Sequence, residues 1–177
     1  MRQQGILLSL FLVLVSTNVF AQKNSNQNTK ENEMNYEIVV KETSAQPALV
    51  IKGKVNVEEV GEAIGGILGK IGAYLETNHI NPTGAPFTRI LNFENGIFEF
   101  EAGFPVSKKM MGYGEIMATE LPKTKVATTI HTGGQDKSEE AYKALHIWMK
   151  KNNIQEAGAP WEVYDSESKM EIFYPIL

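Results

Sequence analysis

The sequence has 177 residues, a formal net charge of −4, 42% hydrophobic residues and no cysteine. The lack of cysteine excludes disulfides, a thiolate nucleophile and a Cys-ligated zinc site. The acidic balance argues against binding nucleic acid, which needs a basic surface. The three histidines do not have the spacing of metal ligands, so we expect neither a metal nor a cofactor.

The first 21 residues have the pattern of a secretory signal peptide. Arg2 supplies a positive start, residues 5–15 are almost wholly apolar, and Val19-Phe20-Ala21 places small residues at positions −3 and −1 of a cleavage site. An apolar run of this length is too short to cross a bilayer. We therefore predict an exported protein, periplasmic or secreted, without stable membrane insertion after cleavage. The alternative is a segment retained as an anchor.

Residues 22–35 are polar, and Met34 is their single apolar side chain. Such a segment cannot bury enough apolar surface to offset the entropy of ordering, so it is predicted to be a disordered linker. The folded domain is expected to span residues 36–177. An exported domain without disulfides must be stabilised by its core alone.

The domain contains an internal duplication. Residues 78–87 align with 152–161 at an offset of 74, and both segments contain Gly-Ala-Pro. Residues 101–106 align with 171–176 at an offset of 70, and residues 48–51 align with 127–130 at an offset of 79. Three matches in the same order predict two copies of one unit, at about 36–106 and 113–176.

Each copy is predicted to contain two strands, a helix and a hairpin. The first copy has strands at 36–41 and 48–52, a helix at 57–76, and a hairpin with the strong turn signal Asn95-Gly96. The second copy has strands at 114–121 and 126–131, a helix at 138–151, and a hairpin that turns at 166–168.

Five glycines interrupt the first predicted helix: Gly61, Gly65, Gly66, Gly69 and Gly72. Each costs up to about 1 kcal/mol relative to alanine in a helix. They indicate either close approach of another backbone or a ligand, or a tightly packed or partly irregular helix. We favour the second interpretation.

Alternation along the hairpins predicts which side chains share a face. With a two-residue turn in the first hairpin, the face toward the helix carries the following side chains: Phe87, Leu91, Phe93, Phe98, Phe100, Ala102 and Phe104. Glu101 lies on the other face. In the second hairpin, a centred turn places Glu162, Tyr164, Glu171 and Phe173 on the face away from the helix.

This centred turn sets Glu162 opposite Glu171. Two carboxylates at that distance repel each other, so a raised pKa is expected for one of them. A sheet face that carries both carboxylates and aromatic rings is either a ligand pocket or a solvated surface. The residues alone leave both interpretations open.

The second copy resembles the GyrI-like family, also called the effector-binding domain of bacterial transcription activators. The resemblance rests on five ordered segments: ELP at 120–122, VATTIHTG at 126–133, SEEAYKALHIW at 138–148, GAPWEVY at 158–164 and EIFYPI at 171–176. It covers about 36–177 and is best over 114–176. No helix-turn-helix pattern precedes it, which favours a domain that does not bind nucleic acid.

The resemblance implies an α+β fold of duplicated β-α-β-β modules related by a pseudo-two-fold axis. A curved antiparallel sheet would carry two main helices on one side and a ligand cleft between the modules. In family members that sense cationic aromatic drugs, a buried glutamate near the end of the last strand meets the positive charge. That position corresponds to Glu171, and Tyr164 corresponds to a tyrosine that stacks on ligands.

Together these features predict an exported protein that binds a small organic ligand, apolar or cationic and aromatic. Glu171 would be the charge partner, and the other lining residues would be Tyr164, Phe173, Glu162 and Glu101. The resemblance also extends to a branch of the family whose members look like hydrolases of reactive small molecules. The alternative is therefore an enzyme in which Glu171 is the general base for water. A binding protein is favoured, and the sequence does not indicate an oligomeric state.

Overall fold

The computed structural model describes residues 36–133, 138–166 and 168–177. The predicted signal peptide (1–21) and linker (22–35) lie outside the described residues. Residues Tyr36–Leu177 form one compact unit. Neither helix in the described part of the chain is both long and apolar enough to span a membrane.

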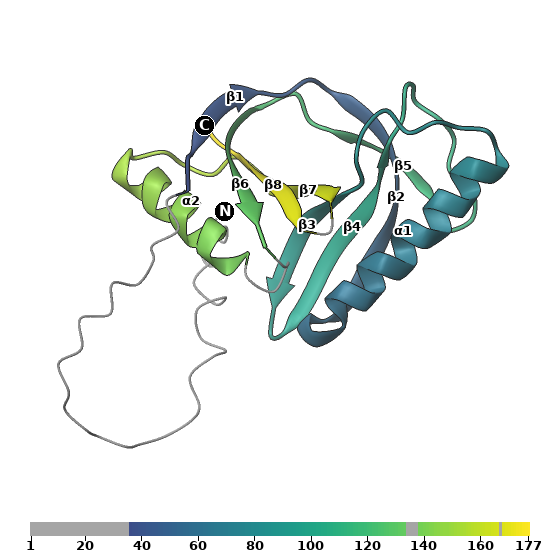
Figure 1. Ribbon diagram of the computed structural model, residues 1–177, viewed down its shortest axis with the longest axis horizontal. Helices are drawn as coiled ribbons and strands as arrows, with labels where there is room; N and C mark the ends of the chain where they lie inside the picture. The colour runs from purple at the N-terminus through teal and green to yellow at the C-terminus, as the bar shows by residue number, and fades with distance from the viewer. Residues whose placement is uncertain (1–35, 134–137, 167) are drawn as a thin grey trace, which may run out of the picture. The chain divides into compact units, whose positions relative to one another are not determined.

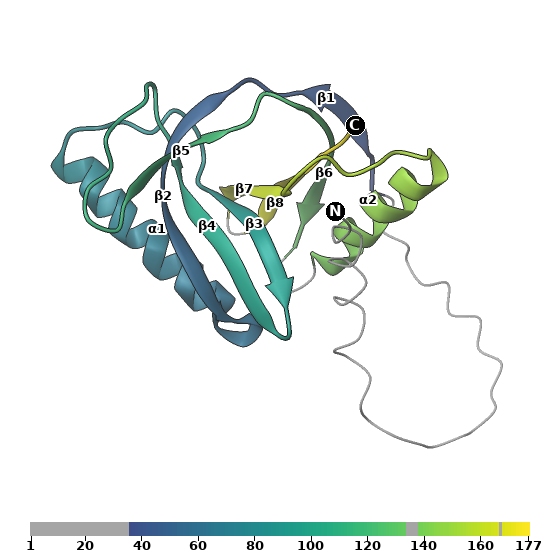
Figure 2. The ribbon, with the colours of Figure 1, turned by 180° about the vertical axis from the view of Figure 1, so that it is seen from behind.

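The elements alternate as two copies of a strand-strand-helix-hairpin unit. Their bounds are β1 Val39–Glu42, β2 Gln46–Asn56, a 3-10 turn η1 Val57–Glu59, α1 Val60–Thr77, β3 Phe87–Glu94, β4 Ile97–Pro105, β5 Met117–Leu121, β6 Lys125–Thr132, α2 Glu139–Lys151, β7 Trp161–Ser166 and β8 Lys169–Pro175. The strands form one antiparallel sheet in the order β1-β6-β8-β7-β3-β4-β2-β5. The sheet is curled, with α1 and α2 on its outside (Figures 1 and 2). The predicted α+β class, curved sheet and helix placement are confirmed.

A pseudo-two-fold axis passes between β3 and β7. Thr88 pairs with Glu162, its own counterpart at the offset of 74, and Phe87–Val163 and Arg89–Trp161 flank this pair. The backbone bonds across the seam are reciprocal. The N–H of Ile90 donates to the carbonyl of Pro160, the N–H of Tyr164 donates to that of Pro86, and both distances are 2.9 Å.

The two helices end in the same way. The side-chain amides of Asn78 and Asn152 donate to the carbonyls of Tyr74 and Trp148, each at 2.8 Å. The next residues, at positions 79 and 153, have left-handed φ values of 54° and 53°. This conformation lets the chain leave a helix while its last carbonyls stay bonded. The repeated cap supports the duplication.

The predicted alignment of the upstream strands was wrong by one residue. Val50 pairs with Gly103 and Thr128 pairs with Phe173. Because Gly103 and Phe173 are counterparts at the offset of 70, Val50 corresponds to Thr128, which is an offset of 78 and not 79. Local sequence identity between two short alanine-led segments gave the false match.

The first strand of each copy is exchanged between the halves of the sheet. β1 pairs with β6, and β5 pairs with β2. Figure 1 shows β1 at the far edge of the half that contains β6 and α2. A side chain of β1 can therefore take part in the chemistry of the second half.

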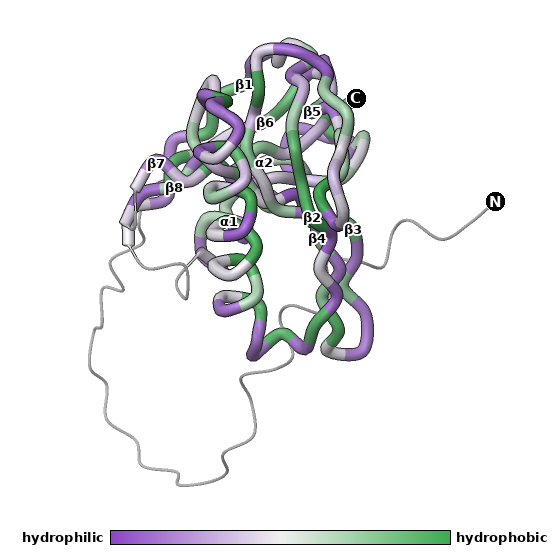
Figure 3. Tube along the Cα trace, turned by 90° about the vertical axis from the view of Figure 1, so that its right-hand side faces the viewer, coloured by the Kyte–Doolittle hydropathy of each residue, from purple (hydrophilic) through white to green (hydrophobic). Residues whose placement is uncertain are grey.

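Helix α1 covers β2 and β4 with a regular apolar stripe. Ile64, Ile67, Ile71 and Leu75 are buried in the core that it shares with these strands. Figure 3 shows the hydrophobic residues that run along β2. The predicted stripe is confirmed, and its burial supplies most of the attraction between helix and sheet.

The interpretation of the five helix glycines as tightly packed or irregular was wrong. They lie in a regular helix; Gly61, Gly65, Gly66 and Gly69 are exposed and Gly72 is half-buried. No described atom outside the helix backbone comes within 4 Å of a Cβ placed on any of them. No described part of the chain therefore requires glycine at these positions.

A β-bulge in β3 reverses part of the predicted hairpin face. The two-residue turn at Asn95-Gly96 is present, with φ values of 52° and 77°. The register then shifts between Ile90 and Asn92, so Leu91 is an extra residue. One extra residue inverts every side chain beyond it. Phe87 therefore lies on the face away from α1, contrary to the prediction.

Candidate functional site

The face of the sheet opposite both helices, which we call the open face, carries paired charges beside aromatic rings. Its charged and aromatic side chains include Lys41, Arg89, Glu101, Trp161, Glu171 and Phe173. The centre is a buried cluster formed by these residues: Ala48, Val50, Phe87, Leu121, Val126, Trp161 and Phe173. Trp161 and Phe173 stack with ring centroids 5.2 Å apart and an interplanar angle of 8°. Because this cluster fills the seam, the accessible residues of the face lie at its margins, and Glu171 and Lys52 are among them.

Glu171 is a partly exposed carboxylate that already has a cation. Its Oε1 accepts hydrogen bonds from Lys41 Nζ at 2.7 Å and from Thr128 Oγ1 at 2.8 Å. The exposed fractions of the two charged side chains are 30% for Glu171 and 41% for Lys41. The Lys41 ammonium also lies 4.6 Å from the centroid of the Phe173 ring. Glu171 and Phe173 are on the predicted face, but Glu171 is not buried.

Glu101 is on the open face as predicted, but it is enclosed. Arg89 Nη2 lies 2.6 Å from Glu101 Oε1, and the two side chains are only 19% and 3% exposed. The same guanidinium reaches β5, where Nη2 donates to Thr119 Oγ1 at 3.3 Å and Nη1 donates to the Glu120 carbonyl at 3.4 Å. A carboxylate neutralised and covered in this way is a structural ion pair in this conformation.

The predicted face of Glu162 and Tyr164 was wrong. Glu162 pairs with Ile172 and not with Glu171, because the β7–β8 register is shifted by one residue from a centred turn, with a bulge between Tyr164 and Ser166. Both side chains therefore point toward the α2 side. There Glu162 accepts hydrogen bonds from the hydroxyls of Tyr142 at 2.7 Å and Tyr164 at 2.8 Å.

The pKa of Glu162 is raised, although Glu171 is not its neighbour. The cause is removal of the carboxylate from water behind the sheet, partly offset by the two tyrosine hydrogen bonds. Burial likewise raises the pKa of Tyr142 well above its usual value. These groups form a closed polar network between α2 and the sheet, separate from the open face.

Lys41, Thr128 and Arg89 were not predicted as members of the site. Lys41 could not be found from local pairing, because its strand crosses to the other half of the sheet. Arg89 was not predicted because the bulge at Leu91 moves its side chain onto the open face. The signal that could have found Thr128 is its register opposite Phe173, which requires the correct offset between the copies.

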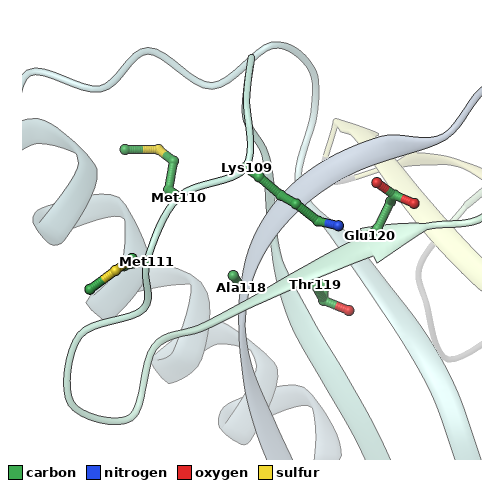
Figure 4. Close-up of a pocket in the computed structure, with 6 residues that line it drawn as sticks. All are labelled: Lys109, Met110, Met111, Ala118, Thr119 and Glu120. Atoms are coloured by element: carbon green, nitrogen blue, oxygen red, sulfur yellow. The ribbon is translucent and has the colours of Figure 1, made fainter.

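A separate hollow lies at the β5 edge of the sheet. Its volume is about 460 Å³, and its lining residues are Lys109, Met110, Met111, Ala118, Thr119 and Glu120. Figure 4 shows Lys109, Thr119 and Glu120 together, with the two methionines on the other side. None of the predicted ligand-binding residues lines it. Within the described residues, no group of three or more His, Asp or Glu side chains is arranged to hold a metal ion.

The element order and the sheet define a duplicated α+β domain with one face of the sheet opposite both helices. The model of the GyrI-like small molecule binding domain matches residues 25–177, and the chain belongs to the GyrI-like family. A comparison with curated proteins gave no significant match. The predicted family is therefore confirmed by the domain model.

Solved structures of low sequence identity share the fold. EcmrR in its complex with DNA has a TM-score of 0.73 at 21% identity, over 83% of this chain and 59% of EcmrR. This chain therefore spans about three fifths of that protein. SAV2435 bound to tetraphenylphosphonium has a TM-score of 0.57 at 13% identity, over 80% and 94%. A hydrolase encoded by lin2189 from Listeria innocua has a TM-score of 0.60 at 9% identity, over 80% and 92%.

Proposed function

We propose that the protein binds a small aromatic molecule, apolar or cationic, on the open face beside the seam between the two halves, at Glu171. Glu171 is the charge partner of a cationic ligand. The observation that carries this proposal is the position of a partly exposed carboxylate beside the stacked rings of Trp161 and Phe173. Apolar sites with a few polar anchors are typical of small-molecule binding. The tetraphenylphosphonium complex of SAV2435 shows that the shared fold can hold such a cation.

Binding is tested with tetraphenylphosphonium by thermal shift and by titration calorimetry. A ligand that binds the native state raises the apparent stability. We expect Glu171→Gln to weaken tetraphenylphosphonium several-fold and to leave binding of neutral triphenylphosphine oxide unchanged. Glu99→Gln is the matched control, because Glu99 is also partly exposed and paired with a lysine, Lys54. Equal loss in both variants would contradict a specific role for Glu171.

A hydrolase is the second candidate, with Glu171 taking a proton from water as general base. It is favoured by the partly exposed carboxylate beside the Thr128 hydroxyl and by the hydrolase from Listeria innocua that shares the fold. The test is incubation with electrophilic small molecules, with product followed by mass spectrometry. An enzyme would lose product formation but keep binding in Glu171→Gln, whereas a binding protein would return the compound unchanged.

We further propose that the chain is exported and does not bind nucleic acid. Export is supported by the apolar run at residues 5–15 and the cleavage pattern before Gln22. Amino-terminal sequencing of the protein from a cell envelope or culture fraction should begin at Gln22, and an intact start would show a retained anchor. The net charge of −4 is unfavourable for contact with the phosphates of nucleic acid. We therefore expect at most weak binding to duplex DNA at low salt, measured by fluorescence anisotropy.

A further inference from the structure

The two halves surround equivalent carboxylates differently. Glu101 and Glu171 are counterparts at the offset of 70. In the sheet register, Glu101 lies between Lys52 and Arg89, and both neighbours carry positive charge. Glu171 lies between Ile130 and Val163, and both are apolar. The residues paired with Glu171 on its two neighbouring strands therefore supply no cation.

The cation of Glu171 comes instead from the exchanged strand β1. Lys41 pairs with Val126, and its counterpart on the exchanged strand β5 is Thr119, which pairs with Ala48. The first half thus places a hydroxyl where the second places an ammonium. Lys41 Nζ touches a carboxylate at 2.7 Å and faces an aromatic ring at 4.6 Å. A carboxylate beside an aromatic face is the environment that recognises an organic cation.

We propose that Lys41 sets the charge preference of the open-face site, because its ammonium occupies the position that a ligand's cation would take. The inference rests on the proposed function. A cationic ligand binds only by displacing Lys41, whereas a neutral ligand leaves the ion pair intact. Displacement is feasible because both side chains are partly exposed, and a pair of this kind is weak.

The consequence is that the wild-type site distinguishes little between charges. Tetraphenylphosphonium and tetraphenylborate have nearly the same shape and opposite charge, so their affinity ratio reports the charge preference of the site. The Lys41–Glu171 pair has no net charge, and we expect a ratio near one. Without Lys41, Glu171 keeps the hydrogen bond from Thr128 and lies between the apolar side chains of Ile130 and Val163. Lys169, two residues away on β8, is paired with Asp165 and attracts Glu171 only at longer range. The negative charge of Glu171 then favours the cation and disfavours the anion.

The test measures both affinities by titration calorimetry for the wild type and three variants. In Lys41→Met, the affinity for tetraphenylphosphonium should rise about tenfold and the affinity for tetraphenylborate should fall about tenfold, which is about 1.4 kcal/mol for each probe. The ratio should therefore shift toward the cation about 100-fold. Lys52→Met is the matched control, since Lys52 is an exposed lysine of the same face in the first half, and its ratio should stay within about twofold. Lys41→Met combined with Glu171→Gln should return the ratio to near the wild-type value.

The outcomes separate the two proposals. If neither the wild type nor any variant binds any probe, the proposed function fails and this inference fails with it. If the wild type binds but Lys41→Met leaves the ratio unchanged, the inference is overturned while the proposed function stands. Thermal unfolding of each variant shows whether the fold is intact. The assignment is supported if the ratio shifts in folded Lys41→Met and does not shift in Lys52→Met or in the double variant.

Discussion

The two halves of the sheet use the same carboxylate position for different purposes. Glu101 is 3% exposed and held by Arg89 from the neighbouring strand of its own half. Glu171 is 30% exposed and held by Lys41 from a strand of the other copy. Both copies have the carboxylate, but its cation lies on an inner strand in the first half and on an edge strand in the second. One half therefore has an enclosed ion pair and the other has an ion pair that is partly exposed to water.

The largest expected change in stability comes from breaking the enclosed Arg89–Glu101 ion pair. Arg89→Met leaves Glu101 buried without its cation, so the free energy of unfolding should fall by about 3 kcal/mol or more. The double variant with Glu101→Met should be within about 1 kcal/mol of the wild type or more stable, because no uncompensated charge remains. Urea denaturation measures both. A single variant as stable as the wild type would show that Glu101 is not enclosed in solution.

The helices extend the comparison between the halves. Gly65→Ala on the exposed side of α1 should raise the free energy of unfolding by up to about 1 kcal/mol, because alanine has less backbone freedom to lose. Ala144→Gly in α2 should lower it by a similar amount. Denaturant titration gives both values. Loss of stability in Gly65→Ala would mean that a backbone or ligand outside the described contacts approaches this helix.

The open pair should contribute much less to stability than the enclosed one. Lys41→Met is expected to change the free energy of unfolding by about 0–1 kcal/mol, because both partners are partly exposed to water. The same denaturation experiment measures it. A loss as large as that of Arg89→Met would remove the distinction between the two carboxylates and would identify Lys41 as a structural residue.

The smallest expected effect is a pH dependence of stability that arises from His146 in the second half. Burial lowers the pKa of His146 from its usual 6.5. The unfolded chain therefore takes up a proton at a higher pH than the folded chain. The contribution of His146 to stability is full above pH 6.5 and is lost as the pH drops from there toward the lowered pKa of the folded state. Because burial raises the pKa of Glu156 and Glu162, which gives the opposite slope, the measurement is the difference in melting temperature between the wild type and His146→Gln. This difference should fall as the pH drops from 7.5 to 5.5.

Alternation along single strands predicted part of the fold well. Phe98, Phe100 and Ala102 alternate with carboxylates, and their faces on β4 are as predicted, as are those of Glu171 and Phe173 on β8. The errors fell on β3 and β7, where single bulges invert the faces. A bulge is decided by packing against neighbouring strands, so the alternation pattern within one strand cannot reveal it.

The candidate site was predictable only in its local part. Glu171 and Phe173 follow from the pattern of one strand, but Lys41 lies 130 residues away in sequence from its partner. That contact depends on the exchange of β1 into the other half, which is a property of the whole sheet. The residue that we propose to set ligand charge is therefore the one that local sequence analysis was least able to find.

The most direct test of a ligand site at Glu171 is a titration of the isotope-labelled protein with tetraphenylphosphonium, followed by NMR. We predict that the largest shift changes occur at Lys41, Glu171 and Phe173, and that the Lys41 side chain loses the ring-current shift from Phe173 as it is displaced. Changes confined to the hollow lined by residues 109–111 and 118–120, or no saturable change at all, would contradict the account.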